Sequence, residues 1–330
     1  MTDLSELKDS KGNRLLNSRQ IRSLEDAGIT TIEMLNTLTK RELKEISGIG
    51  DETVEKIWSI IMNRKHFYKA KEIYEKRKQV KRLTTGSKKL DELLGGGIET
   101  QSITELAGEY GSGKSQMAHQ LSVNVQLPEE QGGLNGKALF FDTEDTFRPE
   151  RIVQMGKAVG LGEKALDGIV LAPCYTTDHQ IFLLNHADKI IKEQNIKLII
   201  VDSLMAHFRS EYIGREVLAE RQQLLNRYLE KLKRLARAFN LVAFVTNQAV
   251  STPDAFMQGS IPVGGNILGH ASTTRLWIRQ VGKTPKRIIR LLESPYLPEG
   301  EAVIQITKNG IEDIEKARLR SPHVKEVSEK

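Results

Sequence analysis

The sequence contains a single cysteine, Cys174, and few aromatic side chains. One thiol excludes an intrachain disulfide and a zinc site built from several cysteines, and we expect it to be a small buried core residue. The longest apolar runs, such as LIIV at 198–201, are too short to cross a bilayer. The polar first residues lack the basic start and apolar stretch of a secretory signal. These absences predict a cytosolic protein that has no membrane partner.

What the sequence does contain is enough material for a large folded core. It has 330 residues, of which 39% are hydrophobic and 28% are charged, an ordinary balance for a globular protein. The formal net charge of +6 is compatible with a polyanionic partner such as nucleic acid. Because many proteins reach this charge without such a partner, the charge alone does not identify one.

Residues 1–63 are predicted to form a small helical domain. Four amphipathic segments each begin with a Ser, Thr or Asp that can cap a helix. The segments are 18–28, 31–38, 39–46 and 51–63. Between the last two, SGIG at 47–50 permits a tight turn that resembles a helix-hairpin-helix unit, whose amides can hold a nucleic-acid phosphate. Simple packing explains such a turn equally well, so both roles stay open.

The pattern changes beyond the highly charged segment 64–82, which we interpret as a linker. Between residues 83 and 314, apolar runs alternate with amphipathic segments. Strands are predicted at 102–108, 137–144, 197–203 and 241–248, and helices at 114–126, 149–161, 178–193 and 219–239. Continuous apolar strands are typical of a parallel sheet covered by helices on both faces, so we expect an α/β fold. Short strand-like segments beyond residue 274 predict a meander at the sheet edge, and 315–330 are expected to be a disordered tail.

The strongest local motif is GEYGSGKS, which fits the G-x-x-x-x-G-K-[ST] pattern of a phosphate-binding loop between a strand and a helix. Its glycines let backbone N–H groups point at phosphate oxygens. Lys114 would reach the β- and γ-phosphates, and the hydroxyl of Ser115 would ligate Mg²⁺. We therefore expect ATP and Mg²⁺ as cofactors, bound by Gly108, Glu109, Tyr110, Gly111, Ser112, Gly113, Lys114, Ser115 and Gln116.

Three further predicted strands end in polar side chains that can act on a bound nucleotide. Asp202 follows LIIV and can hold the metal, directly or through water. Glu144 follows FFDT and can orient and deprotonate the water that attacks the γ-phosphate. Gln248 follows FVTN and can contact the γ-phosphate or this water. Because parallel strands end at one rim, these side chains and Lys114 form the predicted catalytic and metal site.

The order of these motifs resembles that of the archaeal RadA recombinases and their eukaryotic counterparts, which are relatives of bacterial RecA. The resemblance includes SGIG, LTTGSKKLDELLGGGIET, GEYGSGKSQ, FFDTEDTFRPERI, LIIVDSLMAHFRSEYIGRE, VGGNILGHASTTRLWIRQ and SPYLPEGEA. It implies a RecA-like P-loop ATPase core in 83–314. It also implies a nucleoid-associated, DNA-dependent ATPase of recombination and repair that forms filaments on single-stranded DNA, pairs it with homologous duplex and exchanges strands. In this family the residue that corresponds to Arg151 lies beside the adenine of ATP.

The resemblance assigns two segments to DNA. The segment 209–216 follows the Asp202 strand, and the segment 249–272 follows Gln248. Basic side chains can neutralise phosphates there, and glycine amides can approach the sugar-phosphate chain closely. The predicted DNA-binding residues are Arg209, Arg215, Arg221, Gly264 and Gly265. Because the second segment begins at the γ-phosphate sensor, ATP could order it and hydrolysis could release it.

Within the linker, FYKA matches the family's F-x-x-A element. In that element the aromatic ring enters an apolar pocket of the next protomer, the small residue fills a second pocket, and the backbone adds a strand to the neighbour's sheet. Phe67 and Ala70 are therefore the expected polymerisation residues. Their contact joins two different surfaces, so it propagates into a helical filament unless it closes as a ring.

The sequence departs from the family at two positions. Asp145 stands where a Gly is usual after the catalytic Glu, and its carboxylate adds negative charge beside Glu144. Glu293 stands where an Asp is common in the segment that caps the neighbour's nucleotide. The hydrolysis rate and the need for a monovalent cation such as K⁺ therefore stay open.

Two other functions stay open at the level of sequence. A non-catalytic recombination mediator, a paralog of the same fold, would bind ATP and DNA but assist another recombinase. A hexameric RecA-fold helicase would share the phosphate-binding loop, although the helical N-terminal domain and VGGNILGHAS argue against it. The complete Glu144, Gln248 and DNA-binding motifs favour the recombinase.

Overall fold

The computed structural model describes residues 3–8, 12–27, 29, 31–35, 38–46, 48–62, 67–251, 260–262 and 265–314. The helices are α1 (Ser18–Asp26), α2 (Ile32–Leu35), α3 (Lys40–Lys44), α4 (Asp51–Met62), α5 (Ala70–Arg77), α6 (Lys88–Leu93), α7 (Lys114–Asn124), α8 (Pro149–Ala158), α9 (Thr177–Asn185), α10 (Ala187–Glu193), α11 (Ala206–Glu211), α12 (Leu218–Phe239) and α13 (Gly265–Ala271). The strands are β1 (Arg82–Leu83), β2 (Ile98–Glu99), β3 (Ile103–Gly108), β4 (Lys137–Asp142), β5 (Ile169–Pro173), β6 (Ile196–Asp202), β7 (Val242–Ser251), β8 (Ser260–Pro262), β9 (Thr274–Gln280), β10 (Lys286–Glu293), β11 (Gly300–Ile306) and β12 (Ile311–Asp313). Within these described ranges, none of the helices combines the length and the apolar character needed to cross a bilayer.

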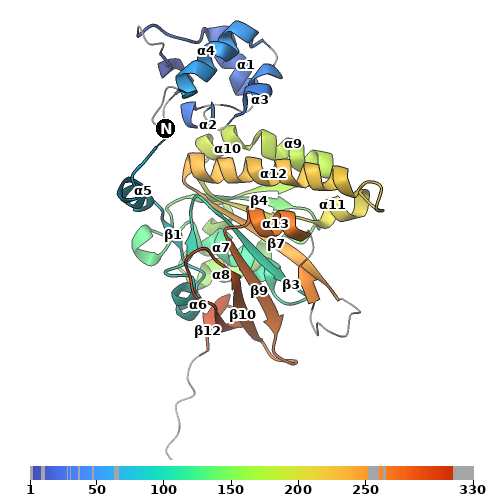
Figure 1. Ribbon diagram of the computed structural model, residues 1–330. Coiled ribbons are helices and arrows are strands. Elements are labelled where there is room, and N and C mark those ends of the chain that lie inside the picture. The colour runs from blue at the N-terminus through green and yellow to red at the C-terminus, as the bar shows by residue number, and fades with distance from the viewer. Residues whose placement is uncertain are drawn as a thin grey trace, which may run out of the picture.

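Most strands belong to one ten-stranded sheet (Figure 1). Its order is β12-β11-β10-β9-β3-β7-β6-β4-β5, and β8 pairs with β7 off this path. Along this order, the neighbouring strands β9, β3, β7, β6, β4 and β5 are all parallel. The strands β9, β10, β11 and β12 form an antiparallel meander. The predicted α/β fold is therefore confirmed, with a mostly parallel sheet flanked by helices and a meander at one edge.

Alternate side chains of the strands pack against different helices. On one face, residues such as Phe141 and Val201 share a core with α9, α10 and α12. On the other face, residues such as Phe140 and Ile200 share a core with α6 and α7. Because helices cover both faces, central strands are buried along their whole length, as all the residues of β3 are. This explains why continuous apolar runs, without strict alternation, mark these strands in the sequence.

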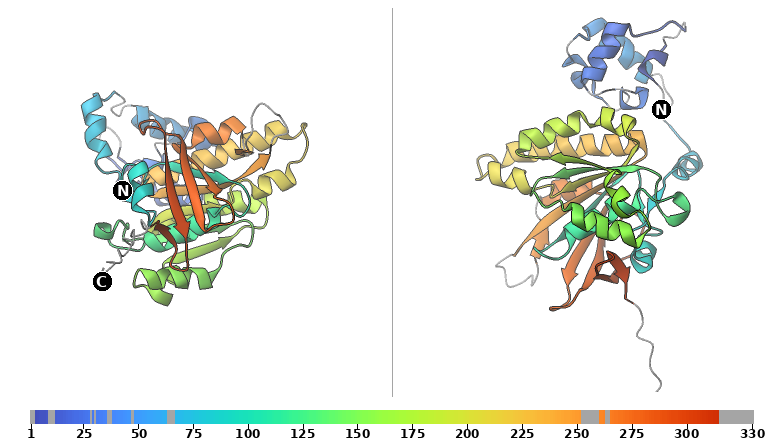
Figure 2. Two further views of the ribbon diagram at one scale, coloured as in Figure 1. Left: turned by 90° about the horizontal axis from the view of Figure 1, so that it is seen from below. Right: turned by 180° about the vertical axis from the view of Figure 1, so that it is seen from behind.

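The four predicted N-terminal helices are confirmed as α1 to α4, which lie over α10 and α12 (Figures 1 and 2). Asn17 and Thr39 begin α1 and α3 with reciprocal capping boxes. Ile49, in the turn that precedes α4, is buried in the core of these helices. Arg234 of α12 reaches the carboxylate of Glu42 in α3 at 3.1 Å, so a charged contact joins this helical layer to the sheet domain.

The structure also contains elements that the sequence did not predict. The charged linker includes α5, a helix without a single buried residue. The predicted helix 178–193 is instead two helices, α9 and α10, separated at His186, whose ring nitrogen lies 2.8 Å from the carbonyl oxygen of Phe182. β5, a partly buried edge strand, was not predicted, although its sequence IVLAP contains a short apolar run. The expected tail, 315–330, lies outside the described residues.

Candidate nucleotide site and DNA-facing segments

The phosphate-binding loop lies between β3 and α7 and is shaped by glycines. At Gly113 φ is +111°, in the left-handed region, and this residue precedes α7 without a side-chain cap. At Gly108 an added Cβ would lie 2.4 Å from the carbonyl oxygen of Ile278, so a larger residue would displace the neighbouring strand. Uncapped N–H groups at the start of a helix can bind a phosphate. The loop therefore has the geometry of an anion cradle, with Glu109, Tyr110 and Gly111 exposed along its outer side.

Lys114 occupies the inner side of this loop. Its Nζ donates to the carbonyl oxygens of Gly108 and Glu109, both at 2.9 Å. Burial lowers the pKa of the Lys114 ammonium, and the nearby carboxylates of Asp202 and Glu144 partly offset that effect. The ammonium is thus held by main-chain oxygens that the oxygens of a phosphate can replace.

Asp202, at the end of β6, is buried beside the start of α7. One carboxylate oxygen accepts a hydrogen bond from the hydroxyl of Thr246, and the hydroxyl of Ser115 lies next to the same carboxylate. The other oxygen, Oδ2, is buried without a hydrogen-bond partner in the described part of the chain. Burial raises the pKa of Asp202, and an added cation would favour its charged form. An orphaned carboxylate oxygen beside a hydroxyl fits Mg²⁺, which prefers oxygen ligands.

Glu144 and Gln248 meet on the same rim. The amide nitrogen Nε2 of Gln248 donates to Oε1 of Glu144 at 2.6 Å. The loop after β4 is held by Asp142, whose buried carboxylate accepts the N–H groups of Glu144, Thr146 and Phe147 at 3.3, 3.1 and 3.0 Å. The local sequence FFDTE therefore contains both the predicted base and the residue that fixes its loop. The structure brings the predicted base and the predicted sensor into direct contact.

Asp145, the departure from the family after Glu144, has a left-handed backbone. Its φ is +53°, and its side chain is exposed. Glycine adopts this region freely and Asp tolerates it, which explains how either residue fits the turn. The carbonyl oxygen of Asp145 accepts a hydrogen bond from Arg148 at 3.1 Å. Because solvent surrounds the carboxylate, its effect on Glu144 is screened.

Arg151 is bound by several acceptors. Its Nε donates to Oε1 of Gln116 at 2.7 Å, and its terminal nitrogens donate to the carbonyl oxygens of Thr307 and Lys308 at 2.7 and 2.8 Å. Arg151 is therefore hydrogen-bonded both to Gln116, the last residue of the predicted ATP-binding loop, and to the turn between β11 and β12. Its place beside adenine stays a prediction.

Arg287 is a further candidate residue of the nucleotide site, one that the sequence did not predict. From β10 its Nε donates to the carbonyl oxygen of Ser112 at 2.7 Å. The two residues are 175 positions apart, so no local motif reveals the contact. The guanidinium supports the phosphate-binding loop from the side of the meander.

A cleft of about 370 Å³ extends from the rim that carries Glu144 and Gln248 to the first segment predicted to bind DNA. Glu144, Gln248 and Arg209 all line it. The remaining lining residues are Ser203, Met205, Ala206 and Ser210. Since Arg209 lies on α11, which follows β6 closely, the strand that ends at Asp202 also positions a basic side chain within reach of the rim.

The rest of the first segment is anchored on both sides. The N–H group of Thr177, at the start of α9, donates to the two carboxylate oxygens of Glu211 at 2.9 and 3.1 Å. Arg221 donates to the carbonyl oxygen of Tyr212 at 3.3 Å, so it braces this segment. Arg215 is exposed between α11 and α12. Of the three predicted arginines, Arg209 and Arg215 are therefore the ones presented to solvent.

The second segment contains more regular structure than its sequence suggests. Its first residues extend β7, and Ser260–Pro262 returns as β8 in an antiparallel pair. Gly265 is the first residue of α13. Gly264 lies outside the described residues, as do 252–259. The segment thus begins as an extension of the strand that holds Gln248.

A buried ion pair joins the central strands β3 and β9. The carboxylate of Glu105, on β3, accepts Nε of Arg275 from β9 and the amide of Asn247 from β7, both at 2.8 Å. The side chain of Glu105 is 0% exposed and that of Arg275 is 20% exposed. Arg275 also approaches Glu293 at 3.5 Å, which links the central strands to the end of β10.

Replacing Arg275 with Ala is expected to lower the free energy of unfolding by roughly 3–5 kcal/mol, because Glu105 would keep a buried charge without a counter-ion. Urea unfolding followed by circular dichroism measures this loss. Arg290→Ala is the matched control, because its ion pair with Glu299 lies on the surface at 3.5 Å. The control substitution should lower the free energy of unfolding by less than about 1 kcal/mol. Equal losses in the two variants would contradict the role of the buried pair.

The sheet order and the glycine-rich loop at the end of β3 define a P-loop protein with a RecA-like α/β core. The sequence matches the Rad51 family over residues 76–314. The chain therefore belongs to the Rad51 family of RecA-type recombinases and ATPases. Proteins of this family are generally DNA-dependent ATPases that use ATP and Mg²⁺, and they typically bind DNA and form filaments.

Proposed function

We propose that this protein is a recombinase of the archaeal RadA type. It would form ATP-dependent filaments on single-stranded DNA, pair this strand with homologous double-stranded DNA and exchange strands. The observation that supports this function best is the cleft that is lined by Arg209 and by the contacting pair of Glu144 and Gln248. A change at the γ-phosphate would alter the contact between Glu144 and Gln248, and the DNA-facing segments leave the same strand ends.

In the proposed reaction the residues have separate roles. Lys114 and the N–H groups at the start of α7 bind and neutralise phosphate oxygens. Ser115 and Asp202 would hold Mg²⁺, which would supply further positive charge to the phosphates. Glu144 orients the attacking water and accepts its proton, while Gln248 exchanges its bond to Glu144 for one to the γ-phosphate.

Self-association is proposed to use the linker of one copy and the sheet edge of the next. Phe67 is 91% exposed, and Ala70 begins α5, which buries no residue. At the far end of the sheet order, β5 is an edge strand, and Leu171 on it is 41% exposed. An edge strand can accept an added strand, and Phe67 would insert among apolar side chains beside it. Because the two surfaces differ, repetition gives a helical filament or a closed ring.

Phe67→Ala is expected to raise the protein concentration needed for assembly about 10- to 100-fold, because burying a Phe ring contributes on the order of 1.5–3 kcal/mol. Sedimentation across a concentration series measures the shift. Tyr68→Ala is the control, because the neighbouring ring is also exposed, at 42%, but occupies a variable position of the F-x-x-A element. If Phe67→Ala assembled at the same protein concentration as wild type, Phe67 would not be a contact residue of self-association.

Electron microscopy with ATP and single-stranded DNA tests the proposed function as a whole. A recombinase is expected to give helical filaments on the DNA. Closed rings that encircle the DNA would instead indicate the hexameric helicase. Protein that binds ATP and DNA without either assembly would indicate the mediator.

A further inference from the structure

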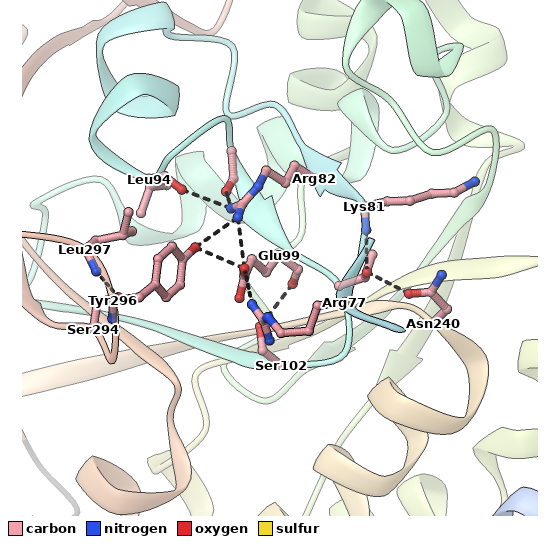
Figure 3. Close-up of polar contacts among 12 residues, drawn as sticks. Arg77, Lys81, Arg82, Leu94, Glu99, Ser102, Asn240, Ser294, Tyr296 and Leu297 are labelled. Carbon is pink, nitrogen blue, oxygen red and sulfur yellow. Dashed lines mark hydrogen bonds and ion pairs between the residues drawn. The ribbon is translucent and has the colours of Figure 1, made fainter. Parts of the chain in front are cut away.

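A buried carboxylate joins three segments that are distant in sequence. Glu99, at the end of β2, is 5% exposed. Its Oε1 accepts hydrogen bonds from Arg77 at 2.9 Å, from Arg82 at 2.9 Å and from the hydroxyl of Tyr296 at 3.0 Å. Figure 3 shows the three donors converging on this oxygen. We call these four residues the Glu99 clamp.

Two of the clamp residues are fixed by further contacts. Arg82 also donates to the carbonyl oxygens of Leu94 and Gly97, at 3.1 and 3.4 Å. Tyr296 lies in the turn after β10, where the hydroxyl of Ser294 accepts the N–H groups of Tyr296 and Leu297 at 3.5 and 3.3 Å (Figure 3). The guanidinium carbons of Arg77 and Arg82 lie 6.0 and 5.9 Å from the centre of the Tyr296 ring. Arg82 and Tyr296 are therefore held in place by contacts outside the clamp.

Arg77 connects the clamp to α5, because it is the last residue of this helix. This helix buries no residue, and Ile73 and Tyr74 on it are 42% and 66% exposed. Hydrophobic packing therefore cannot set its direction. Beyond α5 the chain is held through its backbone, since the carbonyl oxygen of Gln79 accepts the amide of Asn240 and the N–H of Lys81 donates to Thr100.

We propose that the Glu99 clamp fixes the direction in which α5 presents Phe67 and Ala70 to a second copy of this chain. The proposal rests on the self-association described above, and it assigns a positioning role to Arg77 and Tyr296, which act through Glu99. An exposed helix that pivots freely would present its docking residues in many orientations, only a fraction of them productive. The apparent affinity falls in proportion to that fraction, so orientation in advance strengthens assembly.

The clamp also ties the linker to the turn that follows Glu293. Tyr296 contacts both arginines and Glu99, so α5 cannot reorient without disturbing that turn. Docking of the linker on one neighbour would thereby steady a segment at the end of β10 in the same copy.

The test uses the full chain with Arg77→Ala, a variant that removes one donor and leaves Glu99 bound to Arg82 and Tyr296. Arg77→Ala is expected to raise the concentration for assembly about five- to tenfold, and Tyr296→Phe about two- to threefold. Lys78→Ala is the matched control. This variant also removes one positive charge, at the position next to Arg77. The side chain of Lys78 is 59% exposed and that of Arg77 is 55% exposed, but Lys78 forms its ion pair with Glu75 inside the linker. The control should assemble at the wild-type concentration.

A fluorophore on Lys71→Cys reports the rotational freedom of α5 at protein concentrations below assembly. Labelling is selective because Cys174 is buried and burial raises the pKa of its thiol to about 12. Arg77→Ala is expected to lower the fluorescence anisotropy of the label while the melting temperature stays within about 2 °C, a shift typical of a surface change. A merely structural contact would lower the melting temperature instead.

The two proposals fail in different ways. If Phe67→Ala abolishes assembly while Arg77→Ala and Tyr296→Phe assemble like wild type with unchanged anisotropy, the clamp has no positioning role and self-association through Phe67 stands. If Phe67→Ala itself assembles normally, the self-association surface is wrong.

Discussion

Replacing Lys114 with Ala is expected to reduce ATP hydrolysis by at least about 100-fold. The ammonium of Lys114 is the buried positive charge of the phosphate-binding loop, and it lies close to Asp202 and Glu144. Its two bonds to Gly108 and Glu109, at 2.9 Å, hold it in the loop where the β- and γ-phosphates are expected. Alanine removes the charge that would balance the phosphates as the terminal bond breaks. ATP binding should weaken as well, because the same charge acts in the ground state.

Phosphate release in the presence of single-stranded DNA measures this effect. Lys157→Ala is the control, because this lysine is exposed on α8. The control should hydrolyse ATP within about twofold of wild type, as expected for a surface charge. A Lys114→Ala protein that hydrolysed ATP at the wild-type rate would show that the loop is not the catalytic phosphate site.

Replacing Glu144 with Gln is expected to slow hydrolysis by about 10²- to 10⁴-fold while ATP binding persists. Glutamine has nearly the same shape and can still meet Gln248 across the 2.6 Å contact, but it cannot accept a proton from water. Assemblies on DNA should therefore form with ATP and last longer than those of the wild type. Nucleotide binding and phosphate release, measured on the same preparation, separate the two effects.

Asp145→Asn is the matched control for this prediction. The neighbouring carboxylate is exposed, and Asn tolerates the left-handed φ of +53° at this position. The control should hydrolyse ATP within about threefold of wild type, because solvent screens its charge from Glu144. If Asp145→Asn were as slow as Glu144→Gln, the base would be wrongly assigned.

The central strands and the polar residues at their ends could be predicted from sequence because each combines a buried apolar run with one polar terminus. LIIVD and FFDTE are local patterns, and parallel pairing brings their ends together without further information. The glycine-rich loop is equally local. Most of the predicted nucleotide residues therefore come together in space.

Contacts between residues far apart in sequence, and two elements, could not be predicted in the same way. Arg287 reaches Ser112 and Tyr296 reaches Glu99 across 175 and 197 positions, and neither pair leaves a local pattern. α5 escaped prediction because its sequence is a run of charge, and the helix buries nothing that would produce an apolar stripe. β5 was not predicted, because the short apolar run IVLA at 169–172 by itself does not distinguish a strand from a buried helical segment.

The central claim is that this Rad51-family protein is itself the enzyme of strand exchange. The most direct measurement follows joint molecules between single-stranded DNA and homologous duplex, with wild-type protein and with Lys114→Ala. The account predicts that wild-type protein forms joint molecules only when ATP is present, and that Lys114→Ala forms them at least about 100-fold more slowly. Wild-type protein that binds ATP and both DNAs yet forms no joint molecules would contradict the claim.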